Sequence, residues 1–172
     1  HLHANKDHAT LLRAWAVLAR GAPAADPVLI LAGRDDGGLA ALRALAQELG
    51  IAGLVRFPGA VDDIGGLLAA SDLGVFSSRS EGCPNGVLEA MAAGLAVAAT
   101  DLPGIRWALG AETPLAPPGD AVALAALAGR LIGDPTLRAA LGTRNRAAIA
   151  ERFAPLPALE AYVAAIARAS DR

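Results

Sequence analysis

Short apolar runs alternate along most of the chain with longer segments whose apolar residues recur at helical spacing. The first run, PVLILAG, ends at Gly33, and Leu39, Leu42, Leu45 and Leu49 follow at three- and four-residue intervals. A short unbroken apolar run is typical of a buried parallel strand, and the longer spacing is typical of a helix. This alternation predicts a parallel sheet with helices on both faces, the doubly wound Rossmann-like α/β plan.

The other strand-like runs lie before Asp120, and helices follow that residue. The expected strands are LVRFPG, DLGVFSS, LAVAATD and, as a last edge strand, TPLAPP. Asp120 and Asp134 supply N-caps for two further helices, and Pro135 is a first-turn proline. We therefore expect one Rossmann-like domain over residues 1–152 and a C-terminal helix over residues 153–172.

Composition and charge exclude several classes of protein. The 172 residues carry a formal net charge of −2, and Lys and Arg are scattered, so no basic stripe for nucleic acid is present. A single cysteine, Cys83, excludes a disulfide framework and a zinc cluster of several thiolates. We find no uninterrupted apolar run of bilayer length and no signal peptide, so we expect a cytoplasmic location.

The segment SEGCPNGVLEAMAAG joins a Gly/Pro/Asn loop directly to a helix, expected from about Asn85 to Ala93. The first-turn amides of a helix have no internal acceptor and carry a partial positive charge. Gly82, Asn85 and Gly86 can therefore offer backbone N–H groups to an anion, whereas Pro84 cannot. This loop follows a predicted strand, where ligands bind in doubly wound sheets.

Two carboxylates, Glu81 and Glu89, flank this anion site. A carboxylate accepts hydrogen bonds from two neighbouring hydroxyls, such as those of a ribose or a hexose. An anion site beside such groups is the pattern expected for a nucleotide sugar. A plain capped helix, with Glu favoured near its start by the helix dipole, remains the alternative at this point.

The segment SEGCPNGVLEAMAAGLAVAATDLPG closely resembles the E-x7-E region of family 4 retaining glycosyltransferases. The resemblance covers nearly the whole chain. HLHANKDHATLLRAWAVLA resembles their lysine loop and first helix, and PLAPPGDAVALAALAGRLIGDPTLRAALG is similar to their helices after the sheet. In that family such a segment is the C-terminal, donor-binding half of a two-domain GT-B enzyme, so the resemblance implies that the N-terminal acceptor domain is absent here.

The resemblance also implies roles for particular residues. Glu81 would be the catalytic residue against the transferred hexosyl group, Glu89 would bind the ribose hydroxyls, and Lys6 would contact the diphosphate. The base of a UDP-, GDP- or ADP-sugar would lie near Pro58. Transfer would retain anomeric configuration and use no metal or other cofactor. With the loop amides, the implied donor-binding residues are Lys6, Pro58, Gly82, Cys83, Asn85, Gly86 and Glu89.

Two departures from the family pattern stand out. The arginine usual five positions before the lysine is His1 here, and Arg34 and Arg79 are the nearby candidates to replace it. The family's first strand, central in the sheet, would lie before His1. We predict that PVLILAG and DLGVFSS pair directly, that another chain fills the slot by strand exchange or homo-oligomerisation, or that the isolated piece is poorly stable.

The expected partners are a nucleotide sugar and an acceptor sugar, lipid or polysaccharide precursor bound by the missing domain. The full-length protein is expected in the cytoplasm or peripheral at the inner face of the membrane, and the isolated chain is expected to be inactive. The alternatives are a nucleotide-sugar epimerase domain of the same fold and a non-catalytic nucleotide-sugar-binding fragment.

Other polar residues receive simpler interpretations. His8, beside Asp7 in a first helical turn, is expected to make a local polar contact. Cys83 lacks an identifiable histidine partner and is expected to be a small packing residue. Asp35 and Asp36 lack a third ligand at usable spacing, so a solvated turn is expected and no metal site.

Overall fold

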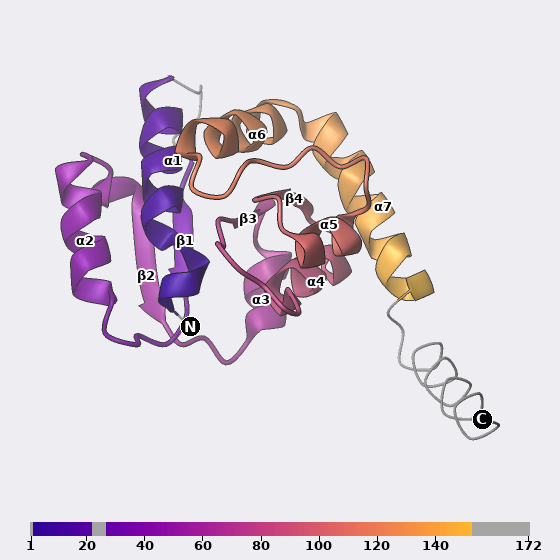
Figure 1. Cartoon of the computed structure of the whole chain (residues 1–172), viewed down its shortest axis with the longest axis horizontal. Helices are drawn as coiled ribbons and strands as arrows, with labels where there is room; N and C mark the ends of the chain where they lie inside the picture. The colour runs from indigo at the N-terminus through magenta and orange to yellow at the C-terminus, as the bar shows by residue number, and fades with distance from the viewer. Residues whose placement is uncertain (1, 22–26, 153–172) are drawn as a thin grey trace.

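The computed structural model of the chain describes residues 2–21 and 27–152 (Figure 1). The helical and strand elements, in chain order, are η1 (Ala4–Lys6), α1 (His8–Arg20), β1 (Leu29–Ala32), α2 (Leu39–Glu48), η2 (Ala52–Leu54), β2 (Val55–Gly59), α3 (Ile64–Ala69), β3 (Leu73–Phe76), α4 (Asn85–Ala92), β4 (Ala96–Ala99), α5 (Pro103–Leu109), α6 (Ala121–Gly133) and α7 (Pro135–Arg152). The predicted alternation of strands and helices is confirmed. The predicted helix over residues 153–172 and the position of His1 lie outside the described residues.

The strands form two parallel pairs, β1 with β2 and β3 with β4. The predicted direct pairing of PVLILAG with DLGVFSS is therefore wrong, because β1 and β3 share no ladder of hydrogen bonds. The amide of Leu2 instead donates to the carbonyl of Arg34, just beyond the end of β1. The other two outcomes, a strand from another chain and low stability of the isolated piece, stay predictions.

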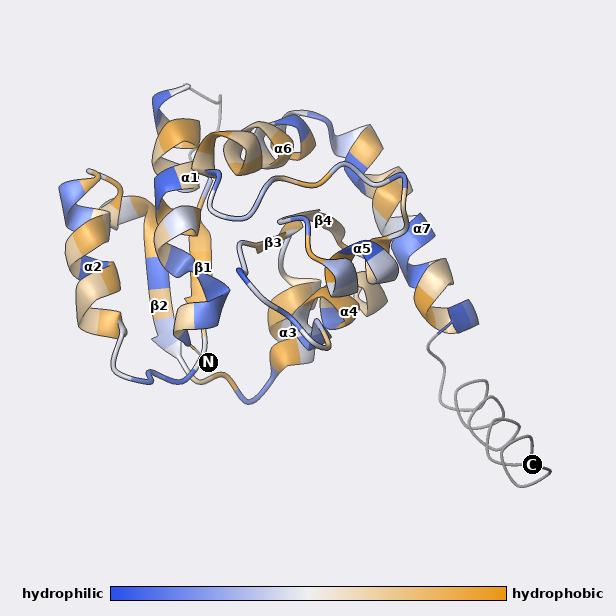
Figure 2. Ribbon diagram, in the orientation of Figure 1, coloured by the Kyte–Doolittle hydropathy of each residue, from blue (hydrophilic) through white to orange (hydrophobic). Residues whose placement is uncertain are grey.

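Helices α1, α2 and α6 cover one face of both strand pairs. Their hydrophobic core contains Leu29 and Leu31 of β1 together with Ala96 and Ala98 of β4, so one continuous core joins the two pairs. These helices connect the two pairs through side-chain packing, without strand-to-strand bonds between β1 and β3. Figure 2 shows the hydrophobic colour of β1 beside α1.

The opposite face of β3 and β4 packs against a second core. Val97 and Ala99 of β4 point into this core, alternating with the residues that face the first one, as the two-residue period of a strand requires. Helices α4 and α5 supply most of its other buried residues. Helices thus cover both faces at β3 and β4, as the doubly wound prediction requires, whereas Ile30 of β1 is 44% exposed.

Helix caps were well predicted because they depend on local sequence. The Asp120 carboxylate accepts from the Ala123 amide at 2.9 Å, and the Asp134 carboxylate accepts from the Leu137 amide at 2.8 Å. The predicted edge strand TPLAPP is reduced to a single parallel bridge between Thr100 and Ala116. The prolines of this segment have no backbone N–H group, so they cannot donate the hydrogen bonds that would extend the pairing with the neighbouring strand.

Candidate functional site

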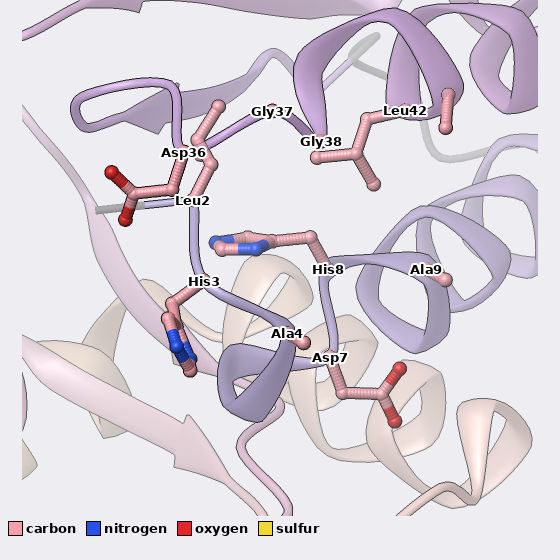
Figure 3. Close-up of a pocket in the computed structure, with 11 residues that line it drawn as sticks. Leu2, His3, Ala4, Asp7, His8, Ala9, Asp36, Gly37, Gly38 and Leu42 are labelled. Carbon is pink, nitrogen blue, oxygen red and sulfur yellow. The ribbon is translucent and has the colours of Figure 1, made fainter.

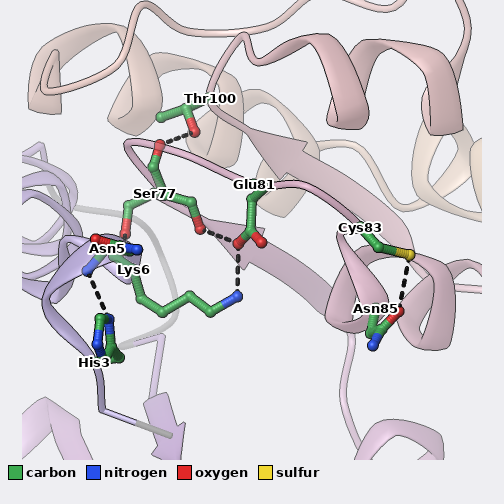
Figure 4. Close-up of polar contacts among 9 residues, drawn as sticks. His3, Asn5, Lys6, Ser77, Glu81, Cys83, Asn85 and Thr100 are labelled. Atoms are coloured by element: carbon green, nitrogen blue, oxygen red, sulfur yellow. Dashed lines mark hydrogen bonds and ion pairs between the residues drawn. The ribbon is translucent and has the colours of Figure 1, made fainter.

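Lys6 and Glu81, which are far apart in the sequence, are in direct contact. Lys6 is the last residue of η1, and its Nζ lies 2.6 Å from Oε1 of Glu81 in the loop after β3. The Glu81 side chain is only 11% exposed, whereas that of Lys6 is 40% exposed. Figure 4 shows the two side chains pointing toward each other. Two of the residues implied by the family resemblance therefore meet at the carboxyl end of β3.

Ser78 and Thr100 fix the Glu81 carboxylate. The Ser78 hydroxyl donates to Oε1 of Glu81 at 2.6 Å, and the Thr100 hydroxyl donates to the Ser78 carbonyl at 2.7 Å. Both residues are buried. Within residues 2–21 and 27–152, no group donates a hydrogen bond to Oε2 of Glu81. One carboxylate oxygen is therefore held by the protein, and the other is available to a hydroxyl donor from a ligand.

The sequence reasoning missed Ser78 and Thr100. A signal was present: Ser78 is the last residue of the predicted strand DLGVFSS and Thr100 the next to last of LAVAATD, at the sheet edge where ligands bind in this type of fold.

The loop before α4 and the first turn of α4 carry backbone amides without an acceptor among the described residues, and this set differs from the predicted one at one position. The Asn85 amide donates to the Cys83 carbonyl at 2.9 Å, so it is already used. Pro84 occupies the N-cap and makes no side-chain cap bond. In the described part of the chain, the amides of Gly82, Cys83 and Gly86 donate to no acceptor. Free donors at a helix start favour an anion there.

Cys83 is exposed, and its thiol donates to the Asn85 side-chain oxygen at 3.1 Å (Figure 4). The expected packing role is therefore wrong: Cys83 lies at the surface of the loop, and this local contact is its one side-chain hydrogen bond within the described residues.

Glu89 and Pro58 lie apart from the Lys6–Glu81 pair. Glu89 is exposed on α4, one turn after Asn85, and its carboxylate makes no hydrogen bond or ion pair with any other described residue. Pro58 is exposed in β2, the outer strand of the other pair. The structure thus brings Lys6 and Glu81 together beside the loop of Gly82 and Cys83, leaves Glu89 open to solvent, and does not bring Pro58 into contact with them.

A cavity of about 460 Å³ lies on the other flank of the lysine turn, between the start of α1 and the start of α2 (Figure 3). Its lining includes Leu2, His8, Asp36 and Gly38, but neither Lys6 nor Glu81. The His8 imidazole points toward Leu2. Burial, helped by the charge of Lys6, lowers the pKa of His8 to about 4 despite the opposing effect of Asp7. His8 is therefore neutral at physiological pH.

Acidification should destabilise the protein through His8. The unfolded state binds a proton at this residue near pH 6.5, whereas the folded state resists protonation until about pH 4. Above pH 6.5, His8 is neutral in both states and does not lower the free energy of unfolding. As the pH falls from 6.5 toward 4, the free energy of unfolding decreases by about 2 kcal/mol, a value that allows for the partial burial of the ring. We expect urea unfolding to show this loss in wild type and in the exposed-site control His3→Gln, but not in His8→Gln. Equal acid sensitivity in all three proteins would contradict this assignment.

The acidic turn after β1 caps a helix. Oδ1 of Asp35 accepts from the amides of Gly37 and Leu39 at 2.8 and 3.1 Å. No group of three or more His, Cys, Asp or Glu side chains with the arrangement of a metal site occurs among residues 2–21 and 27–152. Across those same ranges, we find no helix with the length and hydrophobicity needed to span a membrane.

Comparison with known proteins identifies relatives in bacterial polysaccharide synthesis. The Rhizobium meliloti (strain 1021) lipopolysaccharide core biosynthesis glycosyltransferase LpsE is 34% identical over 128 residues, which are 73% of this chain and 38% of LpsE. LpsD of the same strain, also a lipopolysaccharide core biosynthesis glycosyltransferase, is 33% identical over 124 residues, 71% of this chain and 36% of LpsD. The chain therefore spans well under half the length of these two relatives.

Solved structures share the fold. The crystal structure of Anabaena Alr3699/HepE in complex with UDP and glucose superposes with a TM-score of 0.86 at 24% identity, covering 98% of this chain and 46% of that chain. WaaG, a glycosyltransferase involved in lipopolysaccharide biosynthesis, gives a TM-score of 0.75 at 25% identity, covering 87% of this chain and 40% of that chain. The α/β fold with parallel strands is that of GT-B glycosyltransferases.

A family model described as "Glycosyl transferases group 1" matches residues 1–134. The match includes the lysine turn, all four strands and the loop from Glu81 to Glu89. Because it covers 134 of the 172 residues, the chain belongs to the group 1 glycosyl transferases.

Proposed function

We propose that the chain is the donor-binding half of a family 4 retaining glycosyltransferase and that it binds a nucleoside diphosphate sugar. The observation that carries this proposal is the contact of the Lys6 ammonium with Glu81 next to unpaired amides of the α4 loop. An ammonium group and helix-start amides suit a diphosphate, and a carboxylate with one open oxygen suits a sugar hydroxyl.

In this proposal Lys6 exchanges part of its interaction with Glu81 for the diphosphate. Glu81 is then the catalytic residue that faces the transferred hexosyl group, and Glu89 accepts hydrogen bonds from the ribose hydroxyls. The diphosphate gains negative charge as the bond to the sugar breaks. Lys6 and the amides of Gly82, Cys83 and Gly86 stabilise that charge without a metal ion.

The identity of the donor and acceptor is proposed by analogy. HepE was crystallised with UDP and glucose, which supports UDP among the three candidate nucleotides, UDP, GDP and ADP. LpsE and LpsD act in lipopolysaccharide core biosynthesis, which supports an acceptor that is a sugar, a lipid or a polysaccharide precursor. The acceptor would bind a second domain, so we propose that this chain alone binds donor but transfers no sugar. The full-length enzyme would act in the cytoplasm or peripherally at the inner face of the membrane.

Binding of nucleoside diphosphates tests the proposal. We expect UDP, and more strongly UDP-glucose, to raise the unfolding temperature of the chain, because a ligand at about 100 times its Kd stabilises a folded protein by about 2.7 kcal/mol. GDP and ADP serve as the base-specificity comparison. If a folded sample binds none of the three nucleotides at millimolar concentration, the proposal is wrong. Turnover of UDP-glucose without any acceptor would favour the epimerase alternative instead.

A further inference from the structure

Four contacts attach the turn that carries Lys6 to the segment that carries Glu81. The Arg79 amide donates to the Asn5 carbonyl at 2.8 Å, and the Ser77 hydroxyl lies 2.7 Å from the Lys6 carbonyl and 3.0 Å from the Asp7 carbonyl. Nε of Arg79 donates to Oδ2 of Asp7 at 2.8 Å. None of these contacts uses the side chain of Lys6 or of Glu81. The two segments are therefore joined independently of the ion pair between them.

Asp7 has a backbone conformation that is uncommon among non-glycine residues. Its φ of 46° lies in the left-handed region, and it is the one non-glycine residue with positive φ among those described. Such a conformation persists where surrounding contacts hold it. The Asp7 side chain is 8% exposed and accepts from the Thr10 amide at 3.3 Å, the Thr10 hydroxyl at 2.7 Å and Arg79 at 2.8 Å. The carboxylate thus caps α1 and binds the β3 loop at the same time.

Asp7 and Arg79 lie close in the sequence to the two site residues, Lys6 and Glu81. Asp7 directly follows Lys6, and Arg79 lies two residues before Glu81. The contact between Asp7 and Arg79 therefore fixes the two backbones from which the Lys6 and Glu81 side chains extend. A lysine side chain has a long flexible stem, so its reach to a fixed point depends on where its backbone is held.

We propose that Asp7 and Arg79 are positioning residues that hold Lys6 at the distance from Glu81 at which both can engage one nucleoside diphosphate sugar. This inference rests on the proposed donor-binding function. It assigns no ligand contact to Arg79, whose Nε is directed to Asp7. In this inference Arg79 affects donor binding only by positioning Lys6. Its role therefore differs from that of an arginine that contacts the diphosphate directly.

A double-mutant cycle on UDP affinity tests this assignment. Arg79→Gln, Lys6→Met and the combined variant are titrated with UDP by calorimetry. Arg106→Gln is the matched control, since it breaks a surface ion pair of 2.6 Å with Asp101. We expect Arg79→Gln to weaken UDP binding about 5- to 10-fold when Lys6 is present, and less than twofold in the Lys6→Met background. Arg106→Gln should leave UDP affinity unchanged.

Amide hydrogen exchange provides a readout that needs no ligand. We expect the amides at positions 6, 7 and 79 to exchange at least tenfold faster in Arg79→Gln than in wild type or Arg106→Gln. An equal loss of UDP affinity from Arg79→Gln in both Lys6 backgrounds would overturn the inference, because Arg79 would then act without Lys6. Unchanged exchange at these amides would overturn it as well. If wild type binds UDP, either result leaves the proposed function intact, whereas a folded wild type that binds none of UDP, GDP and ADP contradicts both.

Discussion

Replacing Lys6 with methionine should weaken UDP binding about 10- to 100-fold. Methionine keeps much of the length of the lysine stem but has no charge and no N–H donor. A hydrogen bond from a charged donor is worth about 1.5–3 kcal/mol, which corresponds to this range of affinity. The substitution also leaves Oε1 of Glu81 with Ser78 as its one donor among the described residues, so the carboxylate would repel the diphosphate. Calorimetric titration with UDP measures the change.

Arg13→Met is the control for a general loss of positive charge. Arg13 is exposed on α1, one to two turns beyond Lys6, and its removal changes the net charge by the same amount. We expect its effect on UDP affinity to be less than twofold, since exposed charges are screened over about 10 Å at ordinary ionic strength. If Lys6→Met and Arg13→Met weaken UDP binding equally, Lys6 makes no specific contact with the diphosphate.

Replacing Gly142 with alanine should destabilise the fold by about 3 kcal/mol. A Cβ atom at this position of α7 would lie 2.0 Å from the carbonyl oxygen of Gly94, far inside van der Waals contact. Neighbouring bonds restrict any shift of the helix: Nδ2 of the buried Asn145 side chain donates to the Leu95 carbonyl at 2.8 Å, and the Arg146 side chain donates to the Ala93 carbonyl at 2.7 Å. Relieving the overlap would break these bonds or separate α7 from β4.

Urea or thermal unfolding measures this effect. A loss of 3 kcal/mol corresponds to a fall of about 6–12 °C in Tm for a chain of this size. Gly133→Ala at the end of α6 is the matched control, because a Cβ atom there meets no atom within 4 Å. We expect the control to be neutral or slightly stabilising. A Gly142→Ala variant as stable as Gly133→Ala would show that α7 does not pack this closely on the loop before β4.

The sequence allowed prediction of what depends on local physics. Asp120 and Asp134 cap helices as expected, because a carboxylate three residues before a free amide needs no distant contact. The alternation of residues in β4 between two cores likewise follows from strand geometry. The prediction that β1 pairs with β3 was wrong. Whether these two strands meet depends on how the helices that cover both pairs pack, and local sequence does not determine that packing.

The candidate site was predictable in part. The family resemblance placed Lys6 and Glu81 at one donor site, but their direct ion pair was not predicted, and nothing in the spacing of the two residues reveals it. The Asn85 amide was expected to be free, but a local turn to Cys83 uses it, and such turns depend on backbone angles that composition does not fix. Arg79 was named only as a substitute for the arginine usual at position 1, and its contact with Asp7 was missed, although these opposite charges lie within two residues of Lys6 and Glu81.

In the proposed complex, Glu89 binds the ribose of a nucleotide whose diphosphate lies near Lys6. Comparing UDP with 2′-deoxy-UDP on wild type, Glu89→Ala and the exposed control Glu48→Ala tests it most directly. We predict that wild type and Glu48→Ala prefer UDP by about tenfold, the value of one charge-assisted hydrogen bond, and that Glu89→Ala shows less than a twofold preference. An undiminished preference for UDP in Glu89→Ala would contradict the account.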